Sequence, residues 1–178
     1  NGAVPTTAPE YVVFEGPGMD AFAESPEWGC TFVVLPFMYY ETYGDDSLIR
    51  KYYNGMRRYI DYMTTRANDG IVSFGLGDWY DYGDFRAGFS RNTPVPLVAT
   101  AHYYMVVRYL VEAARMLDNR YDVAYYTHLG EEINKAFHRE FYHKDTRQYG
   151  TGSQCSNALP LFLGMVPAED KQAVLDNL

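Results

Sequence analysis

Apolar and polar positions along the chain follow the spacing of helices. Residues 28–43 (WGCTFVVLPFMYYETY) are apolar almost throughout and end before Gly44, which predicts a buried helix with a kink at Pro36. The stretch TFVVL alone would also fit a strand. Residues 46–66, after Asp45 as a cap, place apolar side chains every three or four positions and basic ones mostly elsewhere, which predicts an amphipathic helix. Its apolar positions are Ile49, Tyr52, Tyr53, Met56, Tyr59, Ile60 and Met63.

The same alternation recurs in the second half of the chain. A mainly apolar helix is predicted over 93–117, where Pro94 lies in the first turn and sacrifices no hydrogen bond. An amphipathic helix is predicted over 121–142. A short apolar helix over 154–164 and a last helix over 167–178 follow.

Apolar and amphipathic helices therefore alternate as hairpins, with long loops at 74–92 and 144–152. The hairpins recur about every 60 residues, which is longer than tetratricopeptide, ankyrin or HEAT repeats. Such long units favour a helical toroid whose loops gather on one side. We predict an all-α fold of about three hairpins, roughly half of a toroid, with residues 1–26 as an extended lead-in loop. A half ring would expose apolar flanks, so a homodimer of the fragment is expected.

Composition and charge exclude several classes of function. The net charge of −8 argues against nucleic-acid binding, which needs basic surfaces to displace counterions. No apolar run is long enough to span a membrane. Cys30 and Cys155 lie far apart and the four histidines have no ligand spacing, so a zinc site is not expected.

The glycine-rich segment 73–85 (SFGLGDWYDYGDF) carries aromatic rings at neither helical nor strand spacing. Rings in such a loop either attach it to the helices or contact a ligand. Its aspartates, Asp78, Asp81 and Asp84, are three residues apart, which does not match the spacing of a calcium-binding EF-hand loop.

Four segments in order resemble signatures of the bacterial α-L-rhamnosidases, which are inverting glycoside hydrolases with an (α/α)6 barrel. They are SPEWGCTFVVLPFMYYETYGDDSLI, SFGLGDWYDYG, GFSRNTPVPLVATAHYY and YGTGSQCSNALPLFLGMVP. The resemblance covers about residues 2–178, so that 1–178 would be a partial six-hairpin catalytic domain. It implies hydrolysis of terminal α-L-rhamnose from glycosides or polysaccharides without a metal or cofactor. It also favours a bacterial parent protein that is periplasmic or extracellular over one that is cytoplasmic.

The resemblance also implies substrate-binding residues. Trp28 and Trp79 match positions where the family places aromatic pocket walls, and Asp78 would accept hydrogen bonds from sugar hydroxyls. Each has an alternative: Trp28 as buried core, Trp79 as an anchor of its loop, and Asp78 as the acceptor of a local turn. Glu24 and Glu27 match no catalytic position of the family and are expected to be solvated.

No catalytic residue is expected within the chain. An inverting glycosidase needs two carboxyl groups about 6.5–9.5 Å apart, and the family's general acid and base have no counterpart here. The expected partners are therefore a rhamnose-containing carbohydrate and the remainder of the parent chain. Two alternatives stay open, namely another six-hairpin glycosidase or lyase and a non-enzymatic helical-repeat binding module. Long aromatic loops are atypical of the second.

Overall fold

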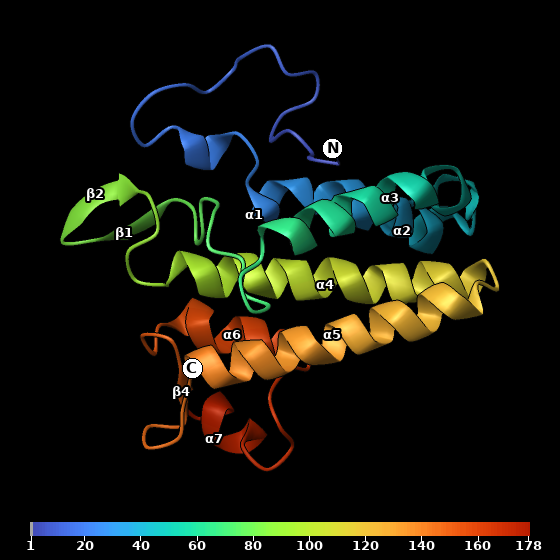
Figure 1. The fold of residues 1–178 in the computed structure, drawn as a ribbon. Helices are drawn as coiled ribbons and strands as arrows, with labels where there is room; N and C mark the ends of the chain where they lie inside the picture. The colour runs from blue at the N-terminus through green and yellow to red at the C-terminus, as the bar shows by residue number, and fades with distance from the viewer. Residues whose placement is uncertain (1) are drawn as a thin grey trace.

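The computed structural model describes residues 2–178 and is mainly helical (Figure 1), which confirms the predicted all-α class. The two-stranded hairpins in the long loops were not predicted. The helices are α1 (Pro26–Gly29), α2 (Thr31–Tyr43), α3 (Ser47–Arg66), α4 (Val95–Met116), α5 (Arg120–Phe141), α6 (Gln154–Phe162) and α7 (Lys171–Leu175), preceded by a 3-10 turn η1 (Asp20–Phe22). Strand β1 (Asp81–Gly83) pairs antiparallel with β2 (Phe85–Gly88), and β3 (Tyr142–His143) with β4 (Gln148–Tyr149).

The helices form three successive hairpins, α2 with α3, α4 with α5, and α6 with α7. In Figure 1, α4 runs through the middle of the molecule, with α2 and α3 on one side and α5 and α6 on the other. The helical hairpins that the hydrophobic pattern predicted are thus present, in the predicted order of apolar and amphipathic helices. None of the helices formed by residues 2–178 is long and apolar enough to cross a membrane.

Two predicted helices differ in extent from those observed. The predicted helix over 28–43 is divided at Cys30 into α1 and α2, and its TFVVL segment is helical, with Pro36 buried inside α2. It ends at Gly44, whose φ of 69° is a left-handed conformation that glycine adopts without steric cost. The predicted last helix over 167–178 is shorter, because Pro167 and Asp170 form a turn before it begins.

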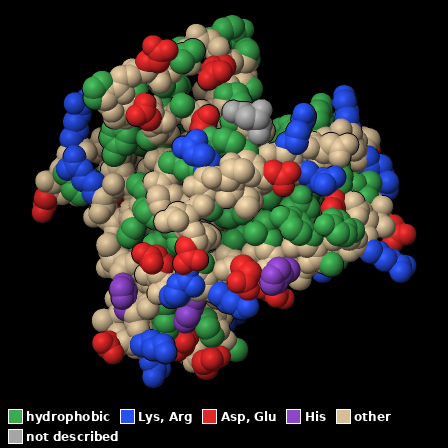
Figure 2. Space-filling model, viewed as in Figure 1, with side chains coloured by type: hydrophobic (Ala, Val, Ile, Leu, Met, Phe, Trp, Pro, Cys, Tyr) green, Lys and Arg blue, Asp and Glu red, His purple; other side chains and the backbone are tan. Residues whose placement is uncertain are grey.

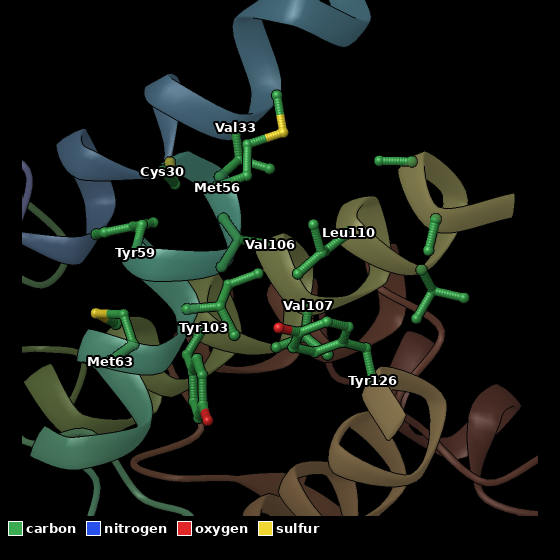
Figure 3. Close-up of a cluster of buried hydrophobic side chains, with 14 of the residues drawn as sticks. Cys30, Val33, Met56, Tyr59, Met63, Tyr103, Val106, Val107, Leu110 and Tyr126 are labelled. Carbon is green, nitrogen blue, oxygen red and sulfur yellow. The ribbon is translucent and has the colours of Figure 1, made fainter. Parts of the chain in front are cut away.

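The main core lies between α2, α3, α4 and α5 (Figure 3). The predicted apolar face of α3 is buried at every position except Tyr52, which is 38% exposed. Each large side chain that is fully buried there contributes about 1.5–3 kcal/mol relative to exposure. The residues labelled in Figure 3 are Cys30, Val33, Met56, Tyr59, Met63, Tyr103, Val106, Val107, Leu110 and Tyr126.

A buried carboxylate joins the first two hairpins. Asp122 of α5 accepts hydrogen bonds from the hydroxyl of Tyr53 on α3 (2.6 Å) and from the side-chain amide of Asn119 (2.8 Å). Arg57 of α3 completes an ion pair with it at 3.4 Å. A buried charge is tolerated only with such partners, so this network also determines how α3 and α5 are oriented.

A second core cluster lies between α4, α5, α6 and β4 and includes the hairpin β3–β4. The imidazole Nδ1 of His138 lies 3.0 Å from the hydroxyl of the buried Tyr149, and its ring stacks on Tyr142 at 4.5 Å between centroids. Burial of the ring lowers the pKa of His138, while Asp170 and Glu169 oppose this shift and Lys144 adds to it. The folded chain therefore favours the neutral imidazole.

Several apolar side chains of α2 and α6 remain exposed. Leu35, Met38 and Tyr43 of α2 are 55%, 55% and 71% exposed, and Phe162 of α6 is 82% exposed. A cleft of about 240 Å³ beside Phe162 is lined by Met105, Arg108, Tyr109, Glu112 and Leu163. On the face shown in Figure 2, acidic and basic side chains are interspersed. Single exposed apolar residues are ordinary, but a set on one helix indicates a surface that another element covers.

We expect residues 1–178, produced alone, to self-associate through this apolar surface. Replacing Leu35 and Met38 together by lysine should shift the chain toward monomer in light scattering, because the charges oppose burial of the α2 face. The matched control replaces Tyr11 and Val13, which are 88% and 66% exposed in the lead-in, by lysine and should leave the association unchanged. A monodisperse, thermally robust monomer of the unmodified chain would contradict this expectation.

We also expect the stability of the chain to fall as the pH drops through the range in which His138 is protonated. The pKa of this group is lower in the folded state than its ordinary value of about 6.5, so the unfolded state binds the proton first. The contribution of the neutral His138 ring to the free energy of unfolding is present above about pH 6.5, and it is lost as the pH falls through the lower pKa of the folded state. Urea unfolding at several pH values should show a shallower pH dependence for His138→Gln than for the unmodified chain. His128→Gln, an exposed position on the same helix, should not change that dependence.

Candidate functional site

The N-terminal ends of helices α1, α4 and α6 lie toward one end of the molecule, together with both long loops (Figure 1). The hydroxyl of Thr151 donates to the carbonyl of Asn92, and the hydroxyls of Thr93 and Ser153 lie 2.8 Å apart. These contacts join segments about 60 residues apart in sequence and confirm that the loops at 74–92 and 144–152 are on the same side. We call this end, formed by residues 74–93 and 144–153, the mouth.

An aromatic cluster lies beside the mouth with Phe22 at its centre. The ring of Phe22 is edge-on to Trp79 at 5.0 Å and to Trp28 at 6.3 Å between centroids. Phe89 contacts both Phe22 (5.7 Å) and Trp79 (5.5 Å), and Phe14 stacks on Phe22 at 5.3 Å. Edge-to-face pairs at these separations are favourable beyond their buried area.

Both tryptophans predicted from the sequence are therefore brought together through their shared contact with Phe22. Each is half-buried, so Trp28 is not a fully buried core residue and neither ring is fully used by its protein contacts. Sequence reasoning missed Phe22 and Phe14, because they lie in the lead-in, which has no periodicity. The available signal was the one that singled out Trp79, namely aromatic rings placed in an irregular segment.

The Asp78 carboxylate lies beside hydroxyl groups at the start of α4 and α6. Its Oδ2 accepts a hydrogen bond from the Thr93 hydroxyl at 3.3 Å, and Ser153, which is in contact with Thr93, caps α6. The thiol of Cys155 lies nearby, and burial together with the charge of Asp78 raises its pKa to about 11. That thiol is therefore protonated at neutral pH and is not a nucleophile.

The neighbouring aspartates have different surroundings. Asp81 is buried and accepts hydrogen bonds from the backbone N–H groups of Tyr82 (2.9 Å), Arg91 (2.7 Å) and Asn92 (2.6 Å). These bonds, those of Arg91 and Asn92 above all, lower the pKa of Asp81. Asp81 closes the base of the β1–β2 loop, whereas Asp84 at its tip is exposed. Among residues 2–178, no group of three or more His, Cys, Asp or Glu side chains could hold a metal ion.

The sequence predicts that Glu24 and Glu27 are solvated, but both side chains are hydrogen-bonded within the protein. Glu24 accepts hydrogen bonds from the hydroxyl of Tyr62 and from Arg66 Nη1 (3.0 Å), which connects the lead-in to α3. Glu27 accepts hydrogen bonds from the backbone N–H groups of Leu76 (3.3 Å) and Gly77 (3.0 Å). Both carboxylates are half-buried, because the lead-in and the loop at 74–92 fold over α1. Spacing along the chain could not reveal these long-range contacts.

Comparison with known proteins identifies a family model that matches the whole chain and relatives that match most of it. The family model described as the bacterial alpha-L-rhamnosidase 6 hairpin glycosidase domain matches residues 1–178. An alpha-L-rhamnosidase of Formosa agariphila is 29% identical over 161 residues, which are 85% of this chain and 16% of the relative. One of Streptomyces avermitilis is 28% identical over 153 residues, 85% of this chain and 14% of the relative. The chain thus spans about a sixth of the length of these curated relatives.

Solved structures show the same relationship. The alpha-L-rhamnosidase from Dictyoglumus thermophilum superimposes with a TM-score of 0.87 at 28% identity, over 100% of this chain and 19% of that one. The Streptomyces avermitilis alpha-L-rhamnosidase, solved in complex with L-rhamnose, superimposes with a TM-score of 0.74 at 25% identity, over 84% of this chain and 14% of that one.

Proposed function

The chain belongs to the bacterial α-L-rhamnosidase six-hairpin glycosidase family, and we propose that it supplies part of the sugar pocket of an inverting α-L-rhamnosidase. That enzyme would hydrolyse terminal α-L-rhamnose from glycosides or polysaccharides. The observation that carries the proposal is the pair of half-buried tryptophans, Trp28 and Trp79, which both pack on Phe22 beside the mouth, with Asp78 directly before Trp79 in the chain. The three hairpins of this chain are half of the six that the family's domain contains.

The chemistry of rhamnose suits these side chains. Rhamnose is a 6-deoxy sugar, so one flank presents C–H bonds and a methyl group, on which an indole ring can stack. Its hydroxyls need acceptors, and the Asp78 carboxylate has one oxygen hydrogen-bonded to Thr93 and capacity left for a hydroxyl donor. The complex of the Streptomyces avermitilis relative with L-rhamnose supports the choice of sugar.

The general acid and base of the reaction are proposed to lie outside residues 1–178. Inverting hydrolysis needs one protonated and one ionised carboxyl about 6.5–9.5 Å apart on either side of the scissile bond. Asp81 is a poor general acid, because backbone hydrogen bonds lower its pKa. Both oxygens of Glu27 already accept backbone N–H bonds. The mouth of this chain therefore binds sugar, and the remainder of the parent chain supplies the acid and base.

In the full-length protein, Trp79→Ala should lower kcat/KM for an aryl α-L-rhamnoside by at least about tenfold, because stacking positions the sugar in the transition state as well as in the bound state. Trp79→Phe retains a ring against Phe22 and should lose less activity. Tyr121→Ala, which removes an exposed ring on α5, serves as the matched control and should keep full activity. Full activity of a protein carrying both Trp28→Ala and Trp79→Ala would show that these rings only pack the loop.

Residues 1–178 alone should not measurably hydrolyse the same rhamnoside. General acid and base assistance contribute about 10²–10⁴-fold each, and their loss leaves little rate above the uncatalysed reaction. The measurement is release of the aryl alcohol by the purified chain, with the full-length protein as the positive control. Turnover by the isolated chain that is abolished by Asp78→Asn or Glu27→Gln would instead place a catalytic carboxylate within it.

A further inference from the structure

Glu27 connects the two segments that carry the tryptophans. It lies in the first turn of α1, directly before Trp28, and its carboxylate reaches the loop just before Asp78 and Trp79. Oε1 accepts the N–H of Gly77 at 3.0 Å, and Oε2 accepts the N–H of Leu76 at 3.3 Å. The hydroxyl of the fully buried Ser25 donates to Oε2 and also accepts the Leu76 N–H at 3.0 Å. We call this arrangement of Ser25 and Glu27 on the N–H groups of Leu76 and Gly77 the carboxylate clamp.

The loop backbone is shaped to approach this carboxylate closely. Gly75 has a φ of 128°, and a Cβ at this position would lie 2.6 Å from Glu27 Oε2 and 2.7 Å from Pro26 Cδ. Gly77 has a φ of 67° and is likewise in the left-handed region. Any other residue at position 75 would meet both a strained backbone and a steric clash, so glycine there permits the clamp to close.

The clamp is placed where a small shift would move the proposed sugar contacts. Gly77 is one residue from Asp78 and two from Trp79, while Glu27 is bonded directly to Trp28. Both tryptophan rings also pack on Phe22, so their separation depends on how the loop is seated against α1. Charge-assisted hydrogen bonds to backbone N–H groups are the stronger and more directional kind.

We propose that Glu27 is a positioning residue, whose carboxylate sets the spacing of Trp28 and Trp79 and the aim of Asp78 toward the sugar. We assign it no catalytic role, because both of its oxygens already accept backbone N–H bonds. The consequence for turnover rests on the proposed rhamnosidase function, whereas the clamp itself is a property of this chain.

The test is Glu27→Gln in the full-length protein. The glutamine keeps the shape of the side chain but presents an amide NH₂ to a backbone N–H, so one arm of the clamp is lost. Glu24→Gln is the matched control, since Glu24 lies three residues earlier and binds Tyr62 and Arg66 on α3 instead. Glu27→Gln should lower kcat/KM for an aryl α-L-rhamnoside about tenfold, mainly through KM, since misplacement of binding groups by a fraction of an ångström is costly. Glu24→Gln should leave both constants within about twofold of the unmodified protein.

Hydrogen–deuterium exchange provides a readout that does not depend on activity. Peptides covering residues 73–79 should exchange faster in Glu27→Gln than in Glu24→Gln, while peptides from α5 exchange alike in both. Ser25→Ala, which removes the hydroxyl from the clamp, should produce smaller changes in the same direction, and it serves as the test if Glu27→Gln does not fold.

The outcomes separate the two proposals. If the unmodified full-length protein does not hydrolyse the rhamnoside but exchange at 73–79 increases in Glu27→Gln, the proposed function fails and the clamp is retained. If the protein is active and neither KM nor exchange at 73–79 differs between Glu27→Gln and Glu24→Gln, the positioning role is overturned. Faster exchange or a lower Tm with unchanged KM would show that Glu27 only stabilises the fold, and this result would also overturn the positioning role.

Discussion

Helix α4 contacts α1, α2, α3, α5 and α6, and its burial is the constraint on which the other elements depend. Residues 97–101 are buried one after another, so every face of its first turns is covered by protein. Both core clusters include side chains of α4, and neither hairpin beside it could bury its apolar face without this helix. Because the first turns of α4 are covered on every side, this end of the helix has little freedom to rotate or slide, and its N-terminus is a fixed point in the molecule.

The mouth is built outward from that fixed point. Thr93, two residues before α4, is buried, and its hydroxyl lies between Asp78 and Ser153, so it joins the loop at 74–92 to the start of α6. On the other side, Glu27 attaches the same loop to α1 through Leu76 and Gly77. Trp79 thus lies on a loop that is anchored at one end to α1 and at the other to the start of α4. An aromatic side chain on such a support loses little further conformational entropy on contacting a ligand.

The parts of this structure that the sequence could predict are those in which apolar residues recur at a regular spacing along the chain. The three-four spacing in residues 46–66 and 121–142 and the apolar runs before and between them identify the helices, because burial of one face or of all faces follows directly from that spacing. The aromatic loop could be singled out as a candidate site from its composition. Phe22, Glu27 and Thr93 could not be placed, since their roles depend on contacts with residues 15 to 60 positions away.

A crystal structure of the full-length protein with bound L-rhamnose tests most directly whether these rings and Asp78 form a sugar pocket. The account predicts that the C–H flank of the sugar lies against Trp79, with Trp28 beside it. A sugar hydroxyl should lie within hydrogen-bonding distance, about 2.5–3.0 Å, of the Asp78 carboxylate. Glu27 should keep its bonds to Leu76 and Gly77 in that complex. Rhamnose bound away from the mouth, with both tryptophans packed only on Phe22, would contradict the account.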